Sequence, residues 1–304
     1  MPITLSFGYD TERPYGDLAK TDKGKAIQRT EVGTCEKLTK LFDREKVPRT
    51  FFILGSFLES CADHIPLEEL RSVFDKKNSL TEIQQHSYSH QVFRPIEGRN
   101  DKKIMTPQEF GADLEKANQV LEDILIVKPT GLRTPLGYPQ DLTDQPGILA
   151  ELQQLGFRYV SSDLRGTSSS YRAFLTKERQ PHTYAHVGFS NIVEIPSHGW
   201  QDAIFTVEHA QKMLQRKPDS ADEIVAHYSE LFNIAETLEQ KQVSIALCLH
   251  PWAVAEYDPQ LEIHKHLVDA ARNKGIRIAS YGEIAFDTAP RTVMSHDYHD
   301  YFTL

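Results

Sequence analysis

Short apolar runs of strand length alternate along the chain with longer segments of helical periodicity. Helices are expected at residues 25–46, 60–78, 107–125, 148–155, 221–240 and 261–273. The expected strands are Ile3 to Gly8, Thr50 to Leu54, Leu80 to Gln85, Gly131 to Thr134, Phe157 to Ser161, Ile192 to Ile195, Val243 to Leu249 and Ile276 to Ala279. Strands that are joined through helices run parallel in one sheet. The alternation therefore predicts one α/β domain over residues 1–304, an irregular (β/α)7-8 barrel of the TIM-barrel type.

Charge and composition exclude several classes of function. The chain has 304 residues, of which 39% are hydrophobic, and a net charge of −9. This acidic balance argues against general binding to nucleic acid or to anionic membranes. The three cysteines are too few and too widely spaced for a disulfide framework or a zinc knuckle. Because no basic leader or long apolar run precedes the first strand, we expect a cytoplasmic protein.

Polar residues of catalytic type follow several of the expected strands. The C-terminal ends of the strands of a (β/α) barrel meet at one rim, which carries the chemistry in enzymes of this architecture. Carboxylates, histidines and an arginine recur there, at Asp10 and Glu12, His86 and His90, Arg133, His198, and His250. Five independent strand ends make coincidence the weaker explanation.

The segment from Glu82 to His90 is the most specific of these ends. In an extended chain, His86 and His90 would lie about 13 Å apart, too far to share an ion. If the segment curls into one helical turn, both imidazoles reach a common metal. A spacing of this kind taken alone also fits two surface histidines in a polar turn.

Together these motifs resemble the polysaccharide deacetylase (NodB-type) superfamily. The resemblance is carried by TFFILG at 50–55, HSYSH at 86–90, GLRTP at 131–135, VEIP at 193–196 and LCLHP at 247–251. Within the superfamily, the chain is most similar to the cytoplasmic peptidoglycan-deacetylase-like and allantoinase-like branch. The resemblance implies a barrel that holds one divalent metal, usually zinc, through two histidines and an acid. It also allows association into a homo-oligomer.

The resemblance assigns roles to individual residues. His86 and His90 are implied as metal ligands, with Glu12 as the acidic ligand and Asp10 as the general base. A rival register makes Asp10 the ligand and leaves Gly8 in the position of the base. His250 is implied as the general acid. Two further roles are implied as well: Arg133 would orient Asp10, and the substrate would lie against Pro135 and Trp200.

Amide hydrolysis needs the same set of groups on chemical grounds. A metal with two imidazole ligands and one carboxylate can polarise a carbonyl and make water more acidic. Asp10 can accept the proton of water, and His250 can donate one to the leaving nitrogen. The sequence thus predicts a hydrolase of amide C–N bonds, most simply a deacetylase of an N-acetylated sugar or cell-wall-type saccharide. The alternatives are an allantoinase- or imidase-like hydrolase of a small cyclic amide, and a non-catalytic binding protein on the same barrel.

Other polar residues are weaker candidates. His296, Asp297 and His299 read as a polar terminus. His264 and His266 lie two apart on an expected helix and are predicted to be surface residues. Tyr15 and Tyr138 are predicted either to line the mouth of the site or to pack elsewhere.

Overall fold

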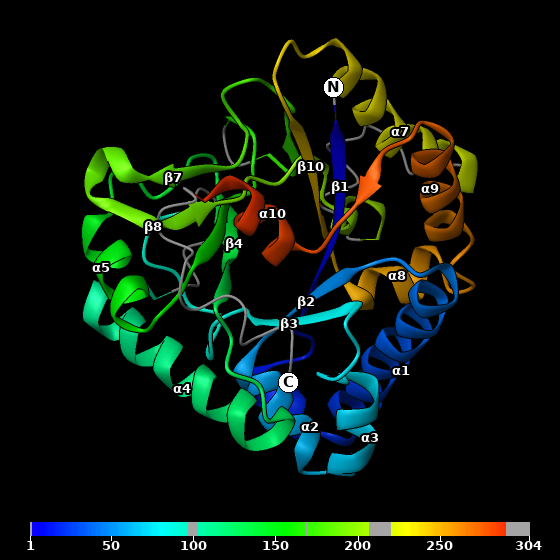
Figure 1. Cartoon of the computed structure of the whole chain (residues 1–304). Helices are drawn as coiled ribbons and strands as arrows, with labels where there is room; N and C mark the ends of the chain where they lie inside the picture. Colours follow the sequence, from blue (N-terminus) through cyan, green and yellow to red (C-terminus); the bar gives the residue numbers. More distant parts are fainter. Residues whose placement is uncertain (1, 97–102, 168–169, 207–219, 290–304) are drawn as a thin grey trace.

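A computed structural model of the chain describes residues 2–96, 103–167, 170–206 and 220–289. Its main sheet has the strand order β10-β1-β2-β3-β4-β5-β8-β7, and β11 pairs with β1. All pairs from β10 to β8 are parallel, and only β7 runs antiparallel, beside β8. The predicted α/β fold is confirmed (Figure 1). The histidine- and acid-containing tail at 295–299 lies outside the described residues.

The elements keep the predicted order along the chain. The strands of the main sheet are β1 (Ile3–Thr11), β2 (Arg49–Ile53), β3 (Thr81–Gln85), β4 (Gly131–Tyr138), β5 (Tyr159–Asp163), β7 (His182–Tyr184), β8 (Phe189–Glu194), β10 (Val243–Leu249) and β11 (Arg277–Ile278). A small second sheet pairs β6 (Arg172–Ala173) with β9 (Gly199–Trp200). The helices are α1 (Asp22–Glu45), α2 (Gly55–Ala62), α3 (Leu67–Val73), α4 (Pro107–Leu125), α5 (Pro146–Gln154), α7 (Ala221–Thr237), α8 (Pro251–Tyr257), α9 (Glu262–Asn273) and α10 (Tyr281–Thr288).

Side chains bridge the gap between β8 and β10, the two ends of the parallel strand order. Gln180 donates its amide N–H to Ser244 O at 3.4 Å and accepts Ser244 N–H at 2.8 Å. His198 N–H donates to Ala246 O at 2.8 Å, and His198 Nδ1 accepts Ala246 N–H at 3.1 Å. Burial lowers the pKa of His198 to about 4, which keeps Nδ1 free of a proton. Gln180 and His198 therefore satisfy the main-chain hydrogen-bonding groups at the open edge of β10. This gives His198, one of the polar residues at the strand ends, a structural role.

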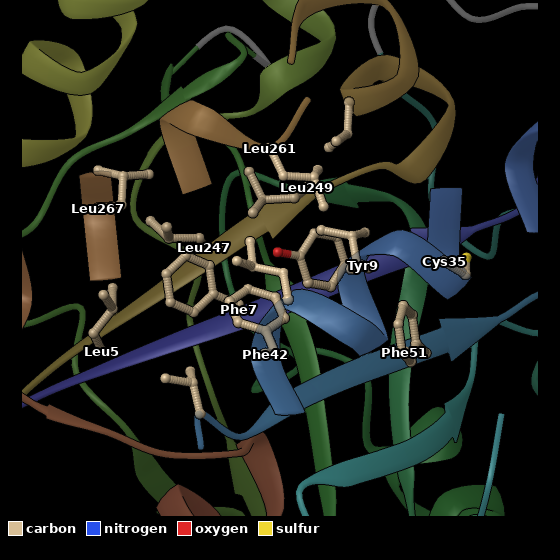
Figure 2. Close-up of a cluster of buried hydrophobic side chains, with 14 of the residues drawn as sticks. Leu5, Phe7, Tyr9, Cys35, Phe42, Phe51, Leu247, Leu249, Leu261 and Leu267 are labelled. Carbon is tan, nitrogen blue, oxygen red and sulfur yellow. The ribbon is translucent and has the colours of Figure 1, made fainter. Parts of the chain in front are cut away.

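The helices other than α10 cover the outside of the sheet, and the main apolar core lies between them and the sheet. Helix α10 packs against the inner face, where Tyr281 meets Phe52. Figure 2 shows Phe7 and Tyr9 of β1 packed with Phe42 of α1, Leu247 of β10 and Leu267 of α9. These side chains are all buried, and the Phe7 and Phe42 rings lie 5.1 Å apart. No helix in the described part of the chain is long and apolar enough to cross a membrane.

The first strand is longer than predicted. We expected a loop from Tyr9 onward, but β1 continues to Thr11 and pairs with β2 as far as Ile53. Tyr9 and Thr11 are buried, and Tyr9 packs against Phe42 and Phe51. The segment looks polar in the sequence, but Tyr9 and Thr11 are core positions that alternate along the strand with Asp10 and Glu12.

The prediction for His264 was wrong. His264 is buried, and its Nδ1 lies 2.6 Å from Asp258 Oδ2. Leu267 and Val268 follow it by three and four residues on α9 and are buried on the same face. His266, one of the two predicted surface histidines, is exposed.

Candidate active site

The pleat of β1 places two carboxylates on one face of the strand. Residues two apart in a strand point the same way, so Asp10 and Glu12 both face the interior of the barrel while Tyr9 faces the outer core. Both are buried. Glu31 of α1 fixes the end of the strand, because its two carboxylate oxygens accept Glu12 N–H at 2.7 Å and Arg13 N–H at 3.1 Å.

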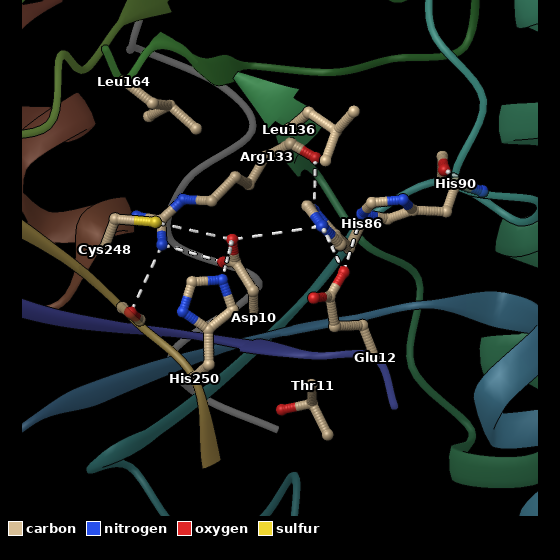
Figure 3. A network of polar contacts seen from close by, with 12 residues as sticks. Asp10, Thr11, Glu12, His86, His90, Arg133, Leu136, Leu164, Cys248 and His250 are labelled. Atoms are coloured by element: carbon tan, nitrogen blue, oxygen red, sulfur yellow. Dashed lines mark hydrogen bonds and ion pairs between the residues drawn. The ribbon is translucent and has the colours of Figure 1, made fainter. Parts of the chain in front are cut away.

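Asp10 is held by a buried arginine, as the sequence predicts. Arg133 of β4 donates from Nη1 to Asp10 Oδ1 at 2.8 Å and to Gly8 O at 3.2 Å (Figure 3). Its Nη2 donates to the hydroxyl of Tyr281, which itself donates to Leu247 O at 3.0 Å. Burial alone would lower the pKa of Arg133, but the charge and hydrogen bond of Asp10, together with Tyr281 and Cys248, outweigh it and the pKa is raised. Arg133 is therefore a fixed cation beside Asp10.

This contact also explains why residue 8 is glycine. A Cβ at Gly8 would lie 2.6 Å from Cε2 of Tyr281 and 2.7 Å from Nη2 of Arg133. The absence of a side chain leaves room for the arginine. Gly8 is thus explained by packing, without the catalytic role that the rival register would give it.

His86 and His90 come together through a left-handed turn. The segment after β3 contains no helical turn, contrary to our expectation, and Ser87 and His90 have φ values of 66° and 56°. Ser87 O accepts the N–H of Gly55 at 2.9 Å, and Asp113 Oδ2 accepts the N–H of Tyr88 at 2.9 Å. The turn brings the two imidazole rings to a centroid distance of 5.1 Å.

Glu12, His86 and His90 form one donor set. His90 Nε2 lies 2.6 Å and His86 Nε2 lies 3.4 Å from Glu12 Oε2. His86 Nδ1 lies 2.9 Å from Arg133 O, which directs Nε2 toward the carboxylate. Burial would raise the pKa of Glu12, but His90 and His86 hold it well below its usual value. Two imidazole nitrogens and an ionised carboxylate oxygen, all within 4.8 Å of one another, suit a zinc-like divalent ion.

A second group of potential ligands, Asp10, Cys248 and His250, fits an ion less well. Cys248 Sγ donates to Asp10 Oδ2 at 3.5 Å, and burial, with Asp10, raises the pKa of this thiol. A protonated thiol is a poor ligand, and the Arg133 cation already neutralises Asp10. All three cysteines are buried and free, as the sequence predicts.

His250 is oriented by a carboxylate that the sequence analysis missed. Its Nδ1 lies 2.6 Å from Asp202 Oδ1, and its backbone N–H donates to Asp202 Oδ2 at 2.8 Å. Burial would lower the pKa of His250, but the charge and hydrogen bond of Asp202 raise it. The Nε2 atom faces the site, 3.8 Å from Asp10 Oδ2. Asp202 thus fixes the His250 ring with Nε2 toward the cavity.

Pro135 and Trp200, the two predicted substrate contacts, are not among the described residues that line the cavity. The cavity has a volume of about 80 Å³, and Leu136, Leu164 and Trp252 are among the residues that line it. Pro135 is buried in β4 directly before Leu136. Trp200 pairs with Arg172 in the small sheet and is not among the described lining residues.

Two further side chains belong to this arrangement. Asp202 has no motif of its own in the sequence, and only the folded chain brings it to His250. Tyr281 begins α10, a helix that the sequence analysis did not predict. Ser280 and Glu283 form a capping box there, and this signal could have revealed the helix. Of the two tyrosines we considered, Tyr15 lies with its ring 5.0 Å from that of His90, whereas Tyr138 is buried against Phe93.

Residues 21–160 match the family model described as polysaccharide deacetylase. The resemblance predicted from the sequence is confirmed. The matched region contains His86, His90 and Arg133, whereas Asp10, Glu12 and His250 lie outside it. No curated protein matches the sequence.

Several solved structures share the fold. The structure named "putative polysaccharide deacetylase from Mycobacterium smegmatis" is 19% identical with a TM-score of 0.67, over 97% of this chain and 94% of that one. A "probable Polysaccharide deacetylase from Pseudomonas aeruginosa PAO1" is 15% identical with a TM-score of 0.64, over 93% of this chain and 90% of that one. The structure named "Puue Allantoinase" is 15% identical with a TM-score of 0.64, over 93% of this chain and 89% of that one. At these identities, the likeness concerns the fold.

Proposed function

We propose that the protein is a metal-dependent hydrolase of amide C–N bonds that deacetylates an N-acetylated sugar or a related cell-wall-type saccharide. One observation carries the proposal. A donor set suited to zinc (Glu12, His86 and His90) adjoins a carboxylate and an imidazole that face each other at 3.8 Å. The family match over residues 21–160 supports the same reaction class.

Asp10 is the proposed general base. Its Oδ2 lies 3.9 Å from His86 Nε2, so a water held between Asp10 and the donor set is within reach of the carboxylate. Arg133 on Oδ1 stabilises the ionised form and leaves Oδ2 for the proton. When bound by Glu12, His86 and His90, a divalent ion supplies Lewis acidity that polarises an acyl carbonyl and acidifies water.

His250 is the proposed general acid. Asp202 accepts the Nδ1 proton, so the second proton of the imidazolium is on Nε2, which faces the cavity. From there it can protonate the leaving nitrogen as the C–N bond breaks. The base and the acid thus have separate supports, Arg133 for Asp10 and Asp202 for His250.

A small cyclic amide is the second candidate substrate, as in an allantoinase-like reaction. The cavity is small, about 80 Å³, and we place the reacting amide inside it. A saccharide would extend out of the cavity, whereas a cyclic amide would sit at its mouth. The same base and acid serve both reactions. The saccharide substrate, zinc as the ion and a cytoplasmic location are part of the proposal.

Metal content of the purified protein tests the proposal first. We expect about one zinc ion per chain, because the three ligands form one site. His86→Ala should lose the ion, and His266→Ala, an exposed histidine on α9, is the matched control that should keep it. A wild-type protein that binds no metal after incubation with zinc would contradict the mechanism.

Turnover separates the enzyme from a binding protein on the same barrel. Asp10→Asn should keep the metal and lose about 10²–10⁴-fold in kcat/KM on N-acetylated sugars or cyclic amides, since it removes the base. A zinc-loaded wild type that hydrolyses neither substrate class would leave the binding protein as the better reading.

A further inference from the structure

We propose that the substrate is anionic, and that Arg13 and Arg165 form the subsite that recognises its carboxylate or phosphate group. This inference rests on the proposed hydrolase, whose reacting amide would lie in the adjoining cavity. Both arginines line that cavity, and neither has a part in the proposed proton transfers. They approach it from different walls, Arg13 following β1 and Arg165 following β5.

Arg13 lies at the mouth of the cavity on an aromatic support. Its guanidinium stacks over the Trp252 ring at 3.8 Å from the centroid, and Trp252 in turn lies 5.1 Å from His250, ring to ring. Arg13 Nε is 3.6 Å from Glu12 Oε1, and the Arg13 side chain is 46% exposed. Within the described residues, its two terminal nitrogens donate no hydrogen bond. Stacking fixes the plane of the fork and leaves those donors for a ligand.

Arg165 is more buried than Arg13 and contacts other parts of the chain. Its Nε donates to Leu136 O at 2.6 Å, and its guanidinium lies 4.7 Å from the centroid of Tyr171. The residue is only 5% exposed, so its charge acts through little water. Leu136, Arg165 and Tyr171 all line the cavity. The main-chain contact holds the arginine at the wall of the cavity that also contains the catalytic groups.

The charges around the cavity favour an anion. The only carboxylates among the described lining residues are Asp10 and Glu12, and each already faces a positive partner or the metal donor set. Among the described residues that line the cavity, those outside the catalytic set include two arginines and no acid, in a chain whose net charge is −9. A cationic wall in an acidic protein concentrates anionic ligands at the site. Guanidinium groups bind carboxylate and phosphate with matched, charge-assisted hydrogen bonds.

Three N-acetyl sugars that share the reacting group test the inference. N-Acetylglucosamine is neutral, N-acetylmuramic acid adds a carboxylate, and N-acetylglucosamine 6-phosphate adds a phosphate. We expect calorimetry on the zinc-loaded protein to show at least one anionic sugar binding about tenfold or more tighter than the neutral one, the size of one charge-assisted hydrogen bond. The two anionic arms identify which group is preferred. The preference should weaken as salt is added.

Substitutions assign the preference to the arginines. Arg13→Gln should remove most of the difference in Kd between the anionic and the neutral sugars, and Arg13→Lys should keep part of that difference. Arg165→Gln, added to Arg13→Gln, should reduce the difference further. Arg44→Gln, at an exposed position on α1, is the matched control and should keep the full preference. Equal Kd values for all three sugars in the wild type, or a preference that survives Arg13→Gln and Arg165→Gln, would overturn the inference.

Hydrolysis of the same three sugars is measured in parallel, so that failure of the deacetylase proposal can be distinguished from failure of the anion subsite. An anionic preference in binding without turnover of any sugar would support the subsite and count against the deacetylase. Turnover of all three sugars with equal kcat/KM and equal Kd would support the deacetylase and remove the subsite.

Discussion

Two buried histidine–aspartate pairs in this protein have nearly the same local geometry and different surroundings. His250 Nδ1 lies 2.6 Å from Asp202, and His264 Nδ1 lies 2.6 Å from Asp258. In both pairs the aspartate also accepts the backbone N–H of its histidine, at 2.8 Å and 3.1 Å. The carboxylate–imidazole pair by itself therefore does not distinguish a catalytic residue from a structural one.

The difference lies at the other ring nitrogen. His250 Nε2 faces a polar cavity and Asp10. His264 Nε2 is buried without a hydrogen-bond partner in the described structure, and its ring lies 6.0 Å from that of Tyr9 in the apolar core. Chemistry requires a proton path to a ligand, and only the first pair has one. The second pair ties α9 to the end of α8 through Asp258.

Removal of each ring gives the largest expected contrast. His250→Gln should lower kcat/KM by about 10²–10⁴-fold, because the leaving nitrogen loses its acid. His264→Leu should keep most of the activity and lower the free energy of unfolding by about 1–3 kcal/mol, because buried Asp258 loses a donor. Steady-state kinetics and urea unfolding of both variants measure this contrast. The comparison fails if the two variants lose activity to a similar extent.

Substitution of the aspartates sharpens the same comparison through pH. Asp202 raises the pKa of His250, and the acid must be protonated to act. Without the carboxylate charge, His250 loses its proton at lower pH, so Asp202→Asn should shift the alkaline limb of kcat/KM to lower pH. Asp258→Asn is the matched control and should leave that limb in place. A pH profile of Asp202→Asn that coincides with that of the wild type would show that Asp202 does not determine the pKa of the general acid.

The parts of the fold that depend on local pattern could be predicted from the sequence. The alternation of strands and helices gave the parallel sheet, and strand β10 was predicted at Val243 to Leu249 as observed. The site was harder, because its residues meet only in three dimensions. Asp202 lies 48 residues before His250, and no local pattern links the two.

Errors arose where a polar residue occupies a position that packing decides. His264 was predicted at the surface from its two-residue spacing with His266 on a helix, but its own face of the helix is apolar. The HSYSH turn closes through left-handed residues held by Asp113 and the start of α2, contacts that lie far away in sequence. The residue types predicted the chemistry, and tertiary contacts determined the geometry.

A third pair, His182 and Asp141, lies near the surface and gives the smallest expected effect. His182 Nε2 is 3.0 Å from Asp141 Oδ2, and the two side chains are 35% and 24% exposed. Burial would lower the pKa of His182, but the hydrogen bonds that its ring donates to Asp141 and to Gln180 O, together with the charges of Glu194 and Asp141, raise it from 6.5 to about 9. The unfolded chain therefore releases this proton at a lower pH than the folded chain does. The stabilisation is full below pH 6.5 and is lost as the pH rises through about 9.

His182→Gln should remove this dependence of the free energy of unfolding on pH. Wild-type stability in urea should fall from pH 6.5 to about 9, and the variant should show a flatter profile over the same interval. Solvent exposure weakens the pair, so we expect a smaller loss of stability than in His264→Leu. His266 is exposed on α9 and has no acidic partner among the described residues, so His266→Gln is the control and should keep the wild-type slope. An unchanged slope in His182→Gln would mean that solvent screens the surface pair completely and that this pair contributes nothing to the pH dependence of stability.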